Sequence, residues 1–97
     1  MLEIRPETVL CIAERVELRS LPETDQYYAF NTGTGDHFAL NYTAFWVLSR
    51  LNAPTSFSQL ESSYMETFNV RRTLGAKHLK EVLAFSLKNA MIKEVVL

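Results

Sequence analysis

Hydrophobic and polar residues alternate in three short segments of the first half of the chain, as they do in β-strands that bury one face. Turn-forming residues, including glycine and proline, separate these segments. Short turns between neighbouring strands are typical of an antiparallel meander, so the pattern predicts a three-stranded antiparallel sheet. The predicted strands cover residues 16–21, 26–31 and 37–40, and the predicted turns cover residues 22–25 and 32–36.

From Tyr42 onward, hydrophobic residues recur every three or four positions, which is the period of an α-helix. Asn41 is placed to cap the first helix, and Ser56 with Gln59 matches a capping box at the start of the second. Residues 70–75 are either a connection or a frayed first turn of the third helix. The pattern therefore predicts three helices, which begin near Tyr42, Phe57 and Ala76.

The order of these elements predicts an α+β fold: an N-terminal three-stranded antiparallel sheet followed by three helices, in a winged-helix-like arrangement. A chain of 97 residues suits one domain with a single core. The apolar run at residues 8–13 has the composition of a short strand or of an ordered arm, and both alternatives stay open. We expect an N-terminal arm at residues 1–14, a β-meander at 15–41 and a three-helix part at 42–92.

Cysteine and histidine content limits the chemistry of the chain. Cys11 is the only cysteine, so no internal disulfide is possible, and its apolar neighbours favour burial. Cys11, His37 and His78 lack metal-ligand spacing, so we expect no metal and no cofactor. Asp25 and Asp36 are scattered relative to these histidines, and catalysis needs clustered acid, base or nucleophilic groups. We therefore expect a protein that is not an enzyme.

Charge and hydropathy argue against two further classes of partner. The net charge is −1, with −3 in residues 1–52 and +2 in residues 53–97, and neither half forms the basic patch typical of nucleic-acid binders. No apolar run approaches the roughly 20 residues that span a bilayer, and the N-terminus lacks the pattern of a signal peptide. We expect no membrane contact and a cytoplasmic location.

The third predicted helix has an unusual outer face. Phe85 and Ile92 lie on the face opposite the predicted core face, and a solvated face does not usually carry such side chains. Either strands of the same chain cover this face, or the face forms one wall of a groove for a partner. Its predicted members are Lys77, Glu81, Phe85, Lys88 and Ile92.

The junction between the predicted sheet and the first helix, Leu40-Asn41-Tyr42-Thr43-Ala44, resembles that of the PqqD-like family, whose small domains are also called precursor-peptide recognition elements. The order of strands and helices is similar over about residues 15–92. Two segments depart from the family pattern. Residues 52–54 replace an Asp-Gly-like turn, and residues 89–90 replace a glycine, so we expect Asn89 to adopt the left-handed conformation.

The resemblance implies a non-catalytic chaperone that binds the leader of a ribosomally made precursor peptide. Family members present the leader to a peptide-modifying enzyme, commonly a radical S-adenosylmethionine enzyme, and the founding members act in pyrroloquinoline quinone biosynthesis. The leader adds as a strand to the edge of the third predicted strand, next to the third helix. The peptide-binding residues that this implies are Asp36, His37, Phe38, Ala39, Leu40, Lys77, Glu81, Phe85, Lys88 and Ile92.

Two other functions compete with peptide binding. A winged-helix nucleic-acid-binding regulator would use the basic residues of the second half of the chain. A self-pairing assembly subunit, such as a homodimer, would join copies through an exposed edge strand. The candidate phosphate contacts of the nucleic-acid-binding alternative are Arg71, Arg72, Lys77, Lys80 and Lys88.

For the strand at residues 37–40 we expect Phe38 and Leu40 to pack under the helices, with His37 and Ala39 on the exposed side.

Overall fold

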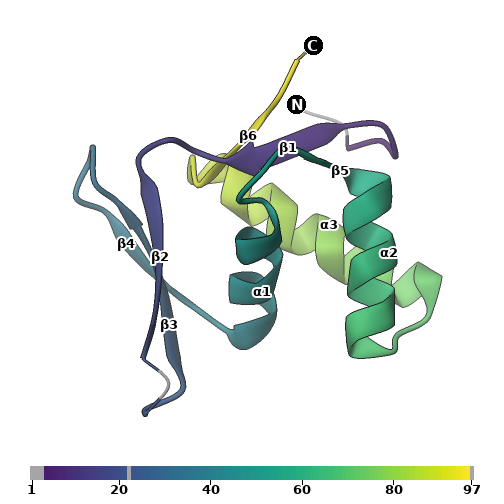
Figure 1. The fold of residues 1–97 in the computed structure, drawn as a ribbon, viewed down its shortest axis with the longest axis horizontal. Coiled ribbons are helices and arrows are strands. Elements are labelled where there is room, and N and C mark those ends of the chain that lie inside the picture. Colours follow the sequence, from purple (N-terminus) through teal and green to yellow (C-terminus); the bar gives the residue numbers. More distant parts are fainter. Residues whose placement is uncertain (1–3, 22, 97) are drawn as a thin grey trace.

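The computed structural model describes residues 4–21 and 23–96, and shows three helices with one small antiparallel sheet beside them and a second above them (Figure 1). The predicted turn residue Pro22 and the first three residues of the predicted N-terminal arm lie outside the described residues. The elements are β1 (Val9–Ile12), β2 (Val16–Leu21), β3 (Gln26–Asn31), β4 (His37–Leu40), α1 (Tyr42–Arg50), β5 (Thr55–Ser56), α2 (Phe57–Phe68), α3 (Arg72–Lys88) and β6 (Ile92–Glu94).

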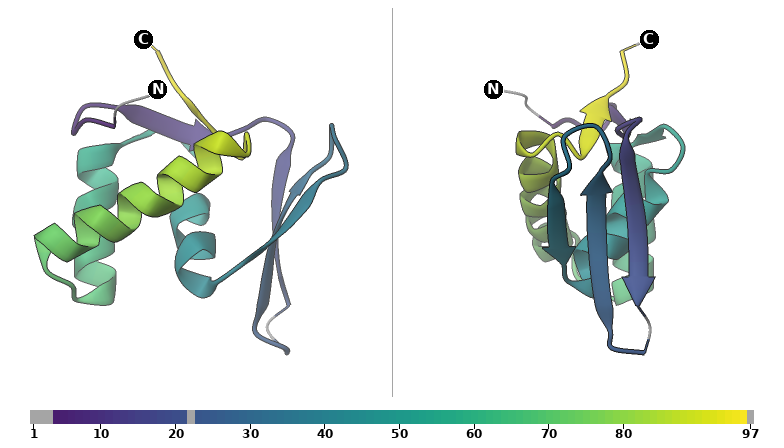
Figure 2. Two further views of the ribbon diagram at one scale, coloured as in Figure 1. Left: turned by 180° about the vertical axis from the view of Figure 1, so that it is seen from behind. Right: turned by 90° about the vertical axis from the view of Figure 1, so that its left-hand side faces the viewer.

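The predicted meander is confirmed as the sheet β2-β3-β4, with β3 in the centre. Both hairpin turns contain a residue with positive φ: Asp25 at 53° and Gly35 at 81°. Aspartate and glycine are among the residues that adopt this conformation most readily. Figure 2 shows the sheet face on, with β2 and β4 as its two outer strands.

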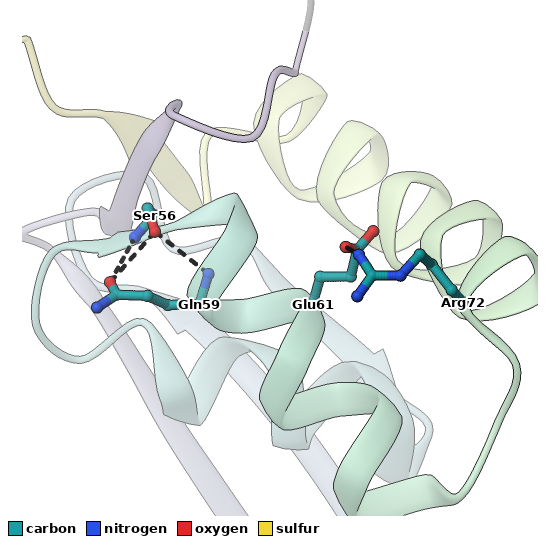
Figure 3. Close-up of polar contacts among 4 residues, drawn as sticks. All are labelled: Ser56, Gln59, Glu61 and Arg72. Carbon is teal, nitrogen blue, oxygen red and sulfur yellow. Dashed lines mark hydrogen bonds and ion pairs between the residues drawn. The ribbon is translucent and has the colours of Figure 1, made fainter.

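Local capping fixes the starts of α1 and α2 as the sequence predicted. The Asn41 side chain accepts a hydrogen bond from the Ala44 amide at 2.8 Å. Ser56 and Gln59 form the capping box of α2, at 3.2 and 3.3 Å (Figure 3). Because Asn41 directly follows β4, the sheet runs into α1 without a loop. This junction fixes the position of β4 relative to the helices.

The third helix begins at Arg72, so residues 72–75 are its first turn rather than a connection. Gly75 is buried, and a Cβ at this position would lie 3.1 Å from Val70 and 3.3 Å from Met65. The absence of a side chain therefore lets the start of α3 approach α2 closely. An ion pair between Arg72 and Glu61, at 2.9 Å, joins the same two helices (Figure 3).

The end of α3 differs from the sequence-based expectation. The backbone amides of Ala90 and Met91 donate to the carbonyls of Leu87 and Ser86, the pattern of a Schellman cap. Ala90 adopts the left-handed conformation, with φ of 56°, whereas Asn89 has φ of −98°. The expectation for Asn89 was wrong because the cap is completed one residue later.

The apolar run near the N-terminus is the strand β1, at the centre of a second sheet in the order β5-β1-β6. Ile92 begins β6, pairs with Ile12 of β1 and is 3% exposed. The placement of Ile92 on the outer face of the third helix was therefore wrong. The helix ends at Lys88, and the chain reverses through the cap to join β1.

The core lies between the two sheets and the three helices. Cys11 is buried, as predicted, and burial raises the pKa of the Tyr64 phenol above its ordinary value. Within the described part of the chain, no helix is long and apolar enough to cross a membrane. The largest fully buried apolar side chains are those of Leu10, Val47, Leu48, Leu51, Leu60, Leu79, Leu83 and Met91.

Candidate functional site

The strand β4 lies at an outer edge of its sheet, on the same side of the molecule as α3 (Figure 2). Its side chains alternate in exposure: His37 and Ala39 are exposed, while Phe38 and Leu40 are partly buried and pack against the core. The expected orientation of the strand is therefore confirmed. The His37 ring also stacks on Phe30 of β3, with 5.6 Å between the ring centroids.

The backbone groups at the free edge of β4 follow from the register of the sheet. The amide of Asn31 donates to the carbonyl of Asp36 at 2.8 Å, which makes these residues a hydrogen-bonded pair. Hydrogen-bonded and non-hydrogen-bonded pairs alternate along an antiparallel ladder. Phe38 and Leu40 therefore bond to β3, and the N–H and C=O groups of His37 and Ala39 point away from the sheet.

A cleft lies beside this edge, between β4, the start of α1 and the middle of α3. Its volume is about 280 Å³, just below the roughly 300–1,000 Å³ of sites for whole small molecules. The cleft is lined by Ala39, Leu40, Asn41, Ala44, Glu81, Val82, Phe85 and Ser86.

The polar groups in the cleft do not form a catalytic arrangement. The side-chain oxygen of Asn41 is used to cap α1. The Ser86 hydroxyl donates its hydrogen bond to the backbone carbonyl of Val82 at 2.8 Å, rather than to a side chain that could act as a base. Only Glu81 brings a charged side chain to the lining. The cleft is thus lined mainly by apolar side chains, with one acidic group.

Phe85 connects the helix wall of the cleft to the strand. Its ring meets Phe38 of β4 edge to face, with 6.2 Å between centroids. Phe85 nevertheless stays 49% exposed, so the chain's own strands cover this face of α3 only in part. An aromatic residue at this position was explained either by coverage from strands of the same chain or by a groove wall. The partial exposure of Phe85 fits a groove wall that the strands cover incompletely.

The remaining predicted site residues lie around the cleft rather than in it. Lys77 and Lys88 are exposed on α3, one turn before Glu81 and about one turn after Phe85. Asp36 lies in the hairpin turn before β4, where its carboxylate accepts a hydrogen bond from the Thr34 hydroxyl at 2.9 Å. Ile92 lies in β6 and does not line the cleft.

Four residues line the cleft but were not predicted as site residues: Asn41, Ala44, Val82 and Ser86. The sequence assigned Asn41 only to the cap of the first helix. The helical pattern assigns the other three to faces that point into the core, and Ser86 is indeed buried at 1%. A helix has a flank between its core face and its solvent face, and the cleft opens along that flank of α3. The spacing of Val82 and Ser86, one turn apart and next to Glu81 and Phe85, is the signal that could have located them.

The structure does not gather the candidate phosphate contacts into a basic surface. Arg72 is paired with Glu61, and the Lys80 ammonium lies over the Phe57 ring, 5.7 Å from its centroid. Lys77 and Lys88 share the helix stripe that carries Glu81 and Phe85. Among residues 4–21 and 23–96, no cluster of histidine, cysteine, aspartate and glutamate side chains could hold a metal ion.

Comparison with known proteins identifies the fold. No family model matches the chain, and no curated protein matches it. Solved structures do match. One is the PqqD truncation of Methylobacterium extorquens PqqCD, which is 15% identical to this chain. The match has a TM-score of 0.76 and covers 94% of this chain and 95% of the other. That protein is described as a functional and stand-alone recognition element for ribosomally synthesized and post-translationally modified peptides. The chain has the PqqD-like fold.

Two further structures with the PqqD-like fold contain a leader peptide. TbiB1 in complex with the TbiA(beta) leader peptide has a TM-score of 0.74 over 89% of this chain and 98% of its own. Lasso peptide synthetase B1 complexed with its leader peptide has a TM-score of 0.71 over 87% and 96%. Both are 15% identical to this chain. The PqqD-like resemblance predicted from the sequence is thus confirmed at the level of the fold.

Proposed function

We propose that this protein is a non-catalytic recognition element that binds the leader segment of a ribosomally made precursor peptide. The leader adds as a strand to β4 and inserts side chains into the cleft beside α3. The observation that carries this proposal is the juxtaposition of a free strand edge and an apolar cleft within the PqqD-like fold. Strand addition to an exposed edge is a recurring mode of peptide recognition.

The main-chain bonds set the register of the bound peptide. The outward groups of His37 and Ala39 offer donors and acceptors to an added strand, and each such bond contributes about 0.5–1.5 kcal/mol net. Ordering a disordered segment costs about 1–2 kcal/mol per residue. Backbone pairing alone would therefore give weak binding, and side-chain burial must supply the remainder.

The cleft supplies that burial and selects the sequence. Alternate side chains of an added strand face the helices, so one of them enters the space between Leu40, Val82 and Phe85. Burying one large apolar side chain contributes about 1.5–3 kcal/mol. We expect a leader with an apolar residue at this position, and dissociation constants in the micromolar range or below, about −8 kcal/mol or stronger.

The charged stripe of α3 forms the rim of the groove. Glu81 lines the cleft, and Lys77 and Lys88 lie on either side of it along the helix. These residues would read the charges that flank the apolar residues of the leader. Rim charges influence association rate and specificity more than affinity, so we assign them a selective role.

We assign the modification itself to a second protein, to which this chain would present the leader. The side chains of Asn41 and Ser86 in the cleft both bond to backbone groups, which supports this assignment. That partner is a peptide-modifying enzyme, of which a radical S-adenosylmethionine enzyme is our first candidate. Coexpression with neighbouring genes for a short peptide and a modifying enzyme, followed by mass spectrometry of the peptide, tests this assignment.

The binding proposal is tested by nuclear magnetic resonance with an isotopically labelled chain and a candidate leader peptide. We expect amide shifts concentrated at residues 37–41 and 79–88, with the His37 and Ala39 amides shifted as new hydrogen bonds form. A scrambled peptide of the same composition is the control. Shifts spread over α2, or confined to the basic residues and abolished by moderate salt, would reject strand addition.

A further inference from the structure

The sheet has a second free edge, at β2, which the proposed peptide site does not use. β2 is the outer strand opposite β4 (Figure 2). Its side chains alternate: Val16 and Leu18 turn toward the core, while Glu17 and Arg19 are exposed on the outer face. The Glu17 and Arg19 side chains are 60% and 69% exposed and form a weak ion pair at 3.6 Å.

The register of β2 and β3 shows which backbone groups point outward at this edge. The Thr32 amide donates to the Arg15 carbonyl at 2.7 Å, so the ladder alternates from this pair. Glu17 and Arg19 bond to β3, and the outward groups belong to Val16, Leu18 and Ser20. The Val16 amide donates to the Ala13 carbonyl. The outward groups that can bond to a second strand are therefore the N–H and C=O groups of Leu18 and Ser20 and the Val16 carbonyl.

We propose that β2 is a homodimer interface, in which two copies of this chain pair their β2 strands antiparallel about a two-fold axis at Leu18. Leu18 then faces Leu18 of the second copy and Val16 faces Ser20, so the two Leu18 residues can bond to each other and each Ser20 amide can donate to the Val16 carbonyl of the other copy. The Ser20 carbonyl gains no backbone partner in this pairing, because the Val16 amide is bonded to Ala13. This pairing joins two three-stranded sheets into one continuous sheet. Isologous pairing of this kind is the commonest symmetry of soluble oligomers.

The charges on β2 select this register over its neighbours. With the axis at Leu18, each Glu17 lies directly opposite the Arg19 of the second copy, which gives two favourable cross-strand pairs. With the axis at Glu17, the two Glu17 side chains would lie directly opposite each other, and with the axis at Arg19 the two Arg19 side chains would do so. Like charges directly opposite each other destabilise a strand pair. The sequence of β2 is therefore complementary to itself in one register.

Space for the second copy lies beside the edge. A hollow of about 760 Å³ borders β2 on its helix side, and Ile12, Ser49 and Asn52 line its far wall. The Leu18 and Ser20 side chains of the second copy would point toward this hollow, because paired residues of adjacent strands share a face. The opposite edge, at β4, stays free in such a dimer, so this inference does not depend on peptide binding.

Charge reversal tests the interface in the full-length chain, by analytical ultracentrifugation over concentrations up to about 1 mM. We expect Glu17→Arg and Arg19→Glu each to weaken self-association by about tenfold or more, because each brings like charges together twice. An equal mixture of the two variants restores dimers, since every cross-strand pair is then of opposite charge. The double variant E17R/R19E also restores them.

Two further variants, one control and one second disruption, test whether the interface lies at β2. Glu66→Arg, an exposed charge reversal on α2, leaves self-association unchanged. Ser20→Pro removes an outward N–H group without breaking the β2–β3 ladder, and we expect it to weaken the dimer. A wild-type chain that stays monomeric at every concentration would overturn the proposal. So would dimers that both charge reversals leave intact, or a mixture of the two variants that fails to associate.

Discussion

The two outer strands of the β2-β3-β4 sheet present the same kind of backbone edge but different surroundings. Beside β4, α3 brings Val82 and Phe85 close to the strand and forms a small, mainly apolar cleft. Beside β2, α1 contributes Ser49 and the turn after α1 contributes Asn52, and the space is larger. Backbone hydrogen bonds alone do not distinguish partners, so these side chains decide what each edge can bind.

The proposed peptide site and the proposed dimer interface would use backbone groups on opposite edges of one small sheet, and each outer strand turns different residues outward. At the end of β3, the Asn31 amide donates to the carbonyl of Asp36, just before β4, while the amide of the next residue, Thr32, donates to the carbonyl of Arg15, just before β2. Each outer strand therefore turns its alternate residues outward, and these differ in chemistry. The β4 edge offers neutral pairing next to an apolar cleft, and the β2 edge offers a charge pattern that is complementary to itself.

The strongest test of the difference replaces one outward-facing residue on each edge with proline. Ala39→Pro removes an outward N–H without breaking the β3–β4 ladder. It leaves a peptide carbonyl unpaired and places a ring in its path, so we expect leader binding to weaken by about 3 kcal/mol. Isothermal titration calorimetry measures the loss, and thermal unfolding checks that the fold persists.

Ser20→Pro is the matched control for Ala39→Pro, because it makes the same change on the opposite edge of the sheet. We expect it to leave leader affinity within about twofold of wild type, a change below about 0.5 kcal/mol. If both proline variants weakened leader binding equally, the β4 edge would have no special role and the proposed groove would be rejected.

Truncating the aromatic wall of the cleft comes next in size. Phe85→Ala should weaken leader binding by about 1–3 kcal/mol, as for a buried anchor at an interface. Because the ring is 49% exposed without peptide, we expect chemical denaturation to show a stability loss below about 1.5 kcal/mol. Leu79→Ala, a fully buried site on the same helix, should instead cost about 2–5 kcal/mol of stability. A comparable loss for Phe85→Ala would mean that the ring belongs to the core.

A smaller effect is expected at the cap of α3, which holds the helix wall in place. Ala90 has φ of 56°, a conformation that costs a residue with a Cβ about 1–2 kcal/mol and costs glycine little. After the greater entropy of glycine in the unfolded chain is subtracted, Ala90→Gly should stabilise the fold by about 0.5–1 kcal/mol. Urea unfolding measures this gain. Destabilisation would contradict the left-handed assignment.

The smallest effect concerns the charged rim. Glu81→Lys should change the affinity for a given leader by about 0.5 kcal/mol, with a sign set by the charge of the peptide residue nearby. Stopped-flow association at low and high salt measures it. The effect should fall as ionic strength rises, whereas the loss from Ala39→Pro should not. A salt-independent change would place Glu81 inside the contact rather than at its rim.

The sequence predicted those parts of the fold that short-range patterns determine. The meander alternates over four to six residues per strand, and the caps at Asn41 and Ser56 depend on neighbours three residues away. The sheet β5-β1-β6 escaped prediction because its pairs join residues far apart, such as Leu10 with Thr55 and Glu94. Strands of two or three residues carry no period that a sequence could reveal.

The candidate site was predicted in outline, with its errors on α3. The orientation of β4 followed from the apolar character of Phe38 and Leu40, and the position of Phe85 followed from the helical period. Ile92 was misplaced because that period was extended beyond Lys88, where the cap reverses the chain. Val82 and Ser86 were missed because the edge of a buried face becomes a cleft wall only once β4 is positioned beside it.

The pairing of β1 with β6 has a consequence for joining this protein to others. The two strands lie side by side on one side of the helices, away from the tip of the β2–β3 hairpin (Figure 1). If an enzyme were fused by a flexible linker after β6, the linker would not have to cross β2 or β4, the outer strands of the other sheet. Such a tether raises the effective concentration of a bound leader at the enzyme to the millimolar range. Covalent fusion is therefore a practical way to measure how much of a modification rate depends on delivery rather than on chemistry.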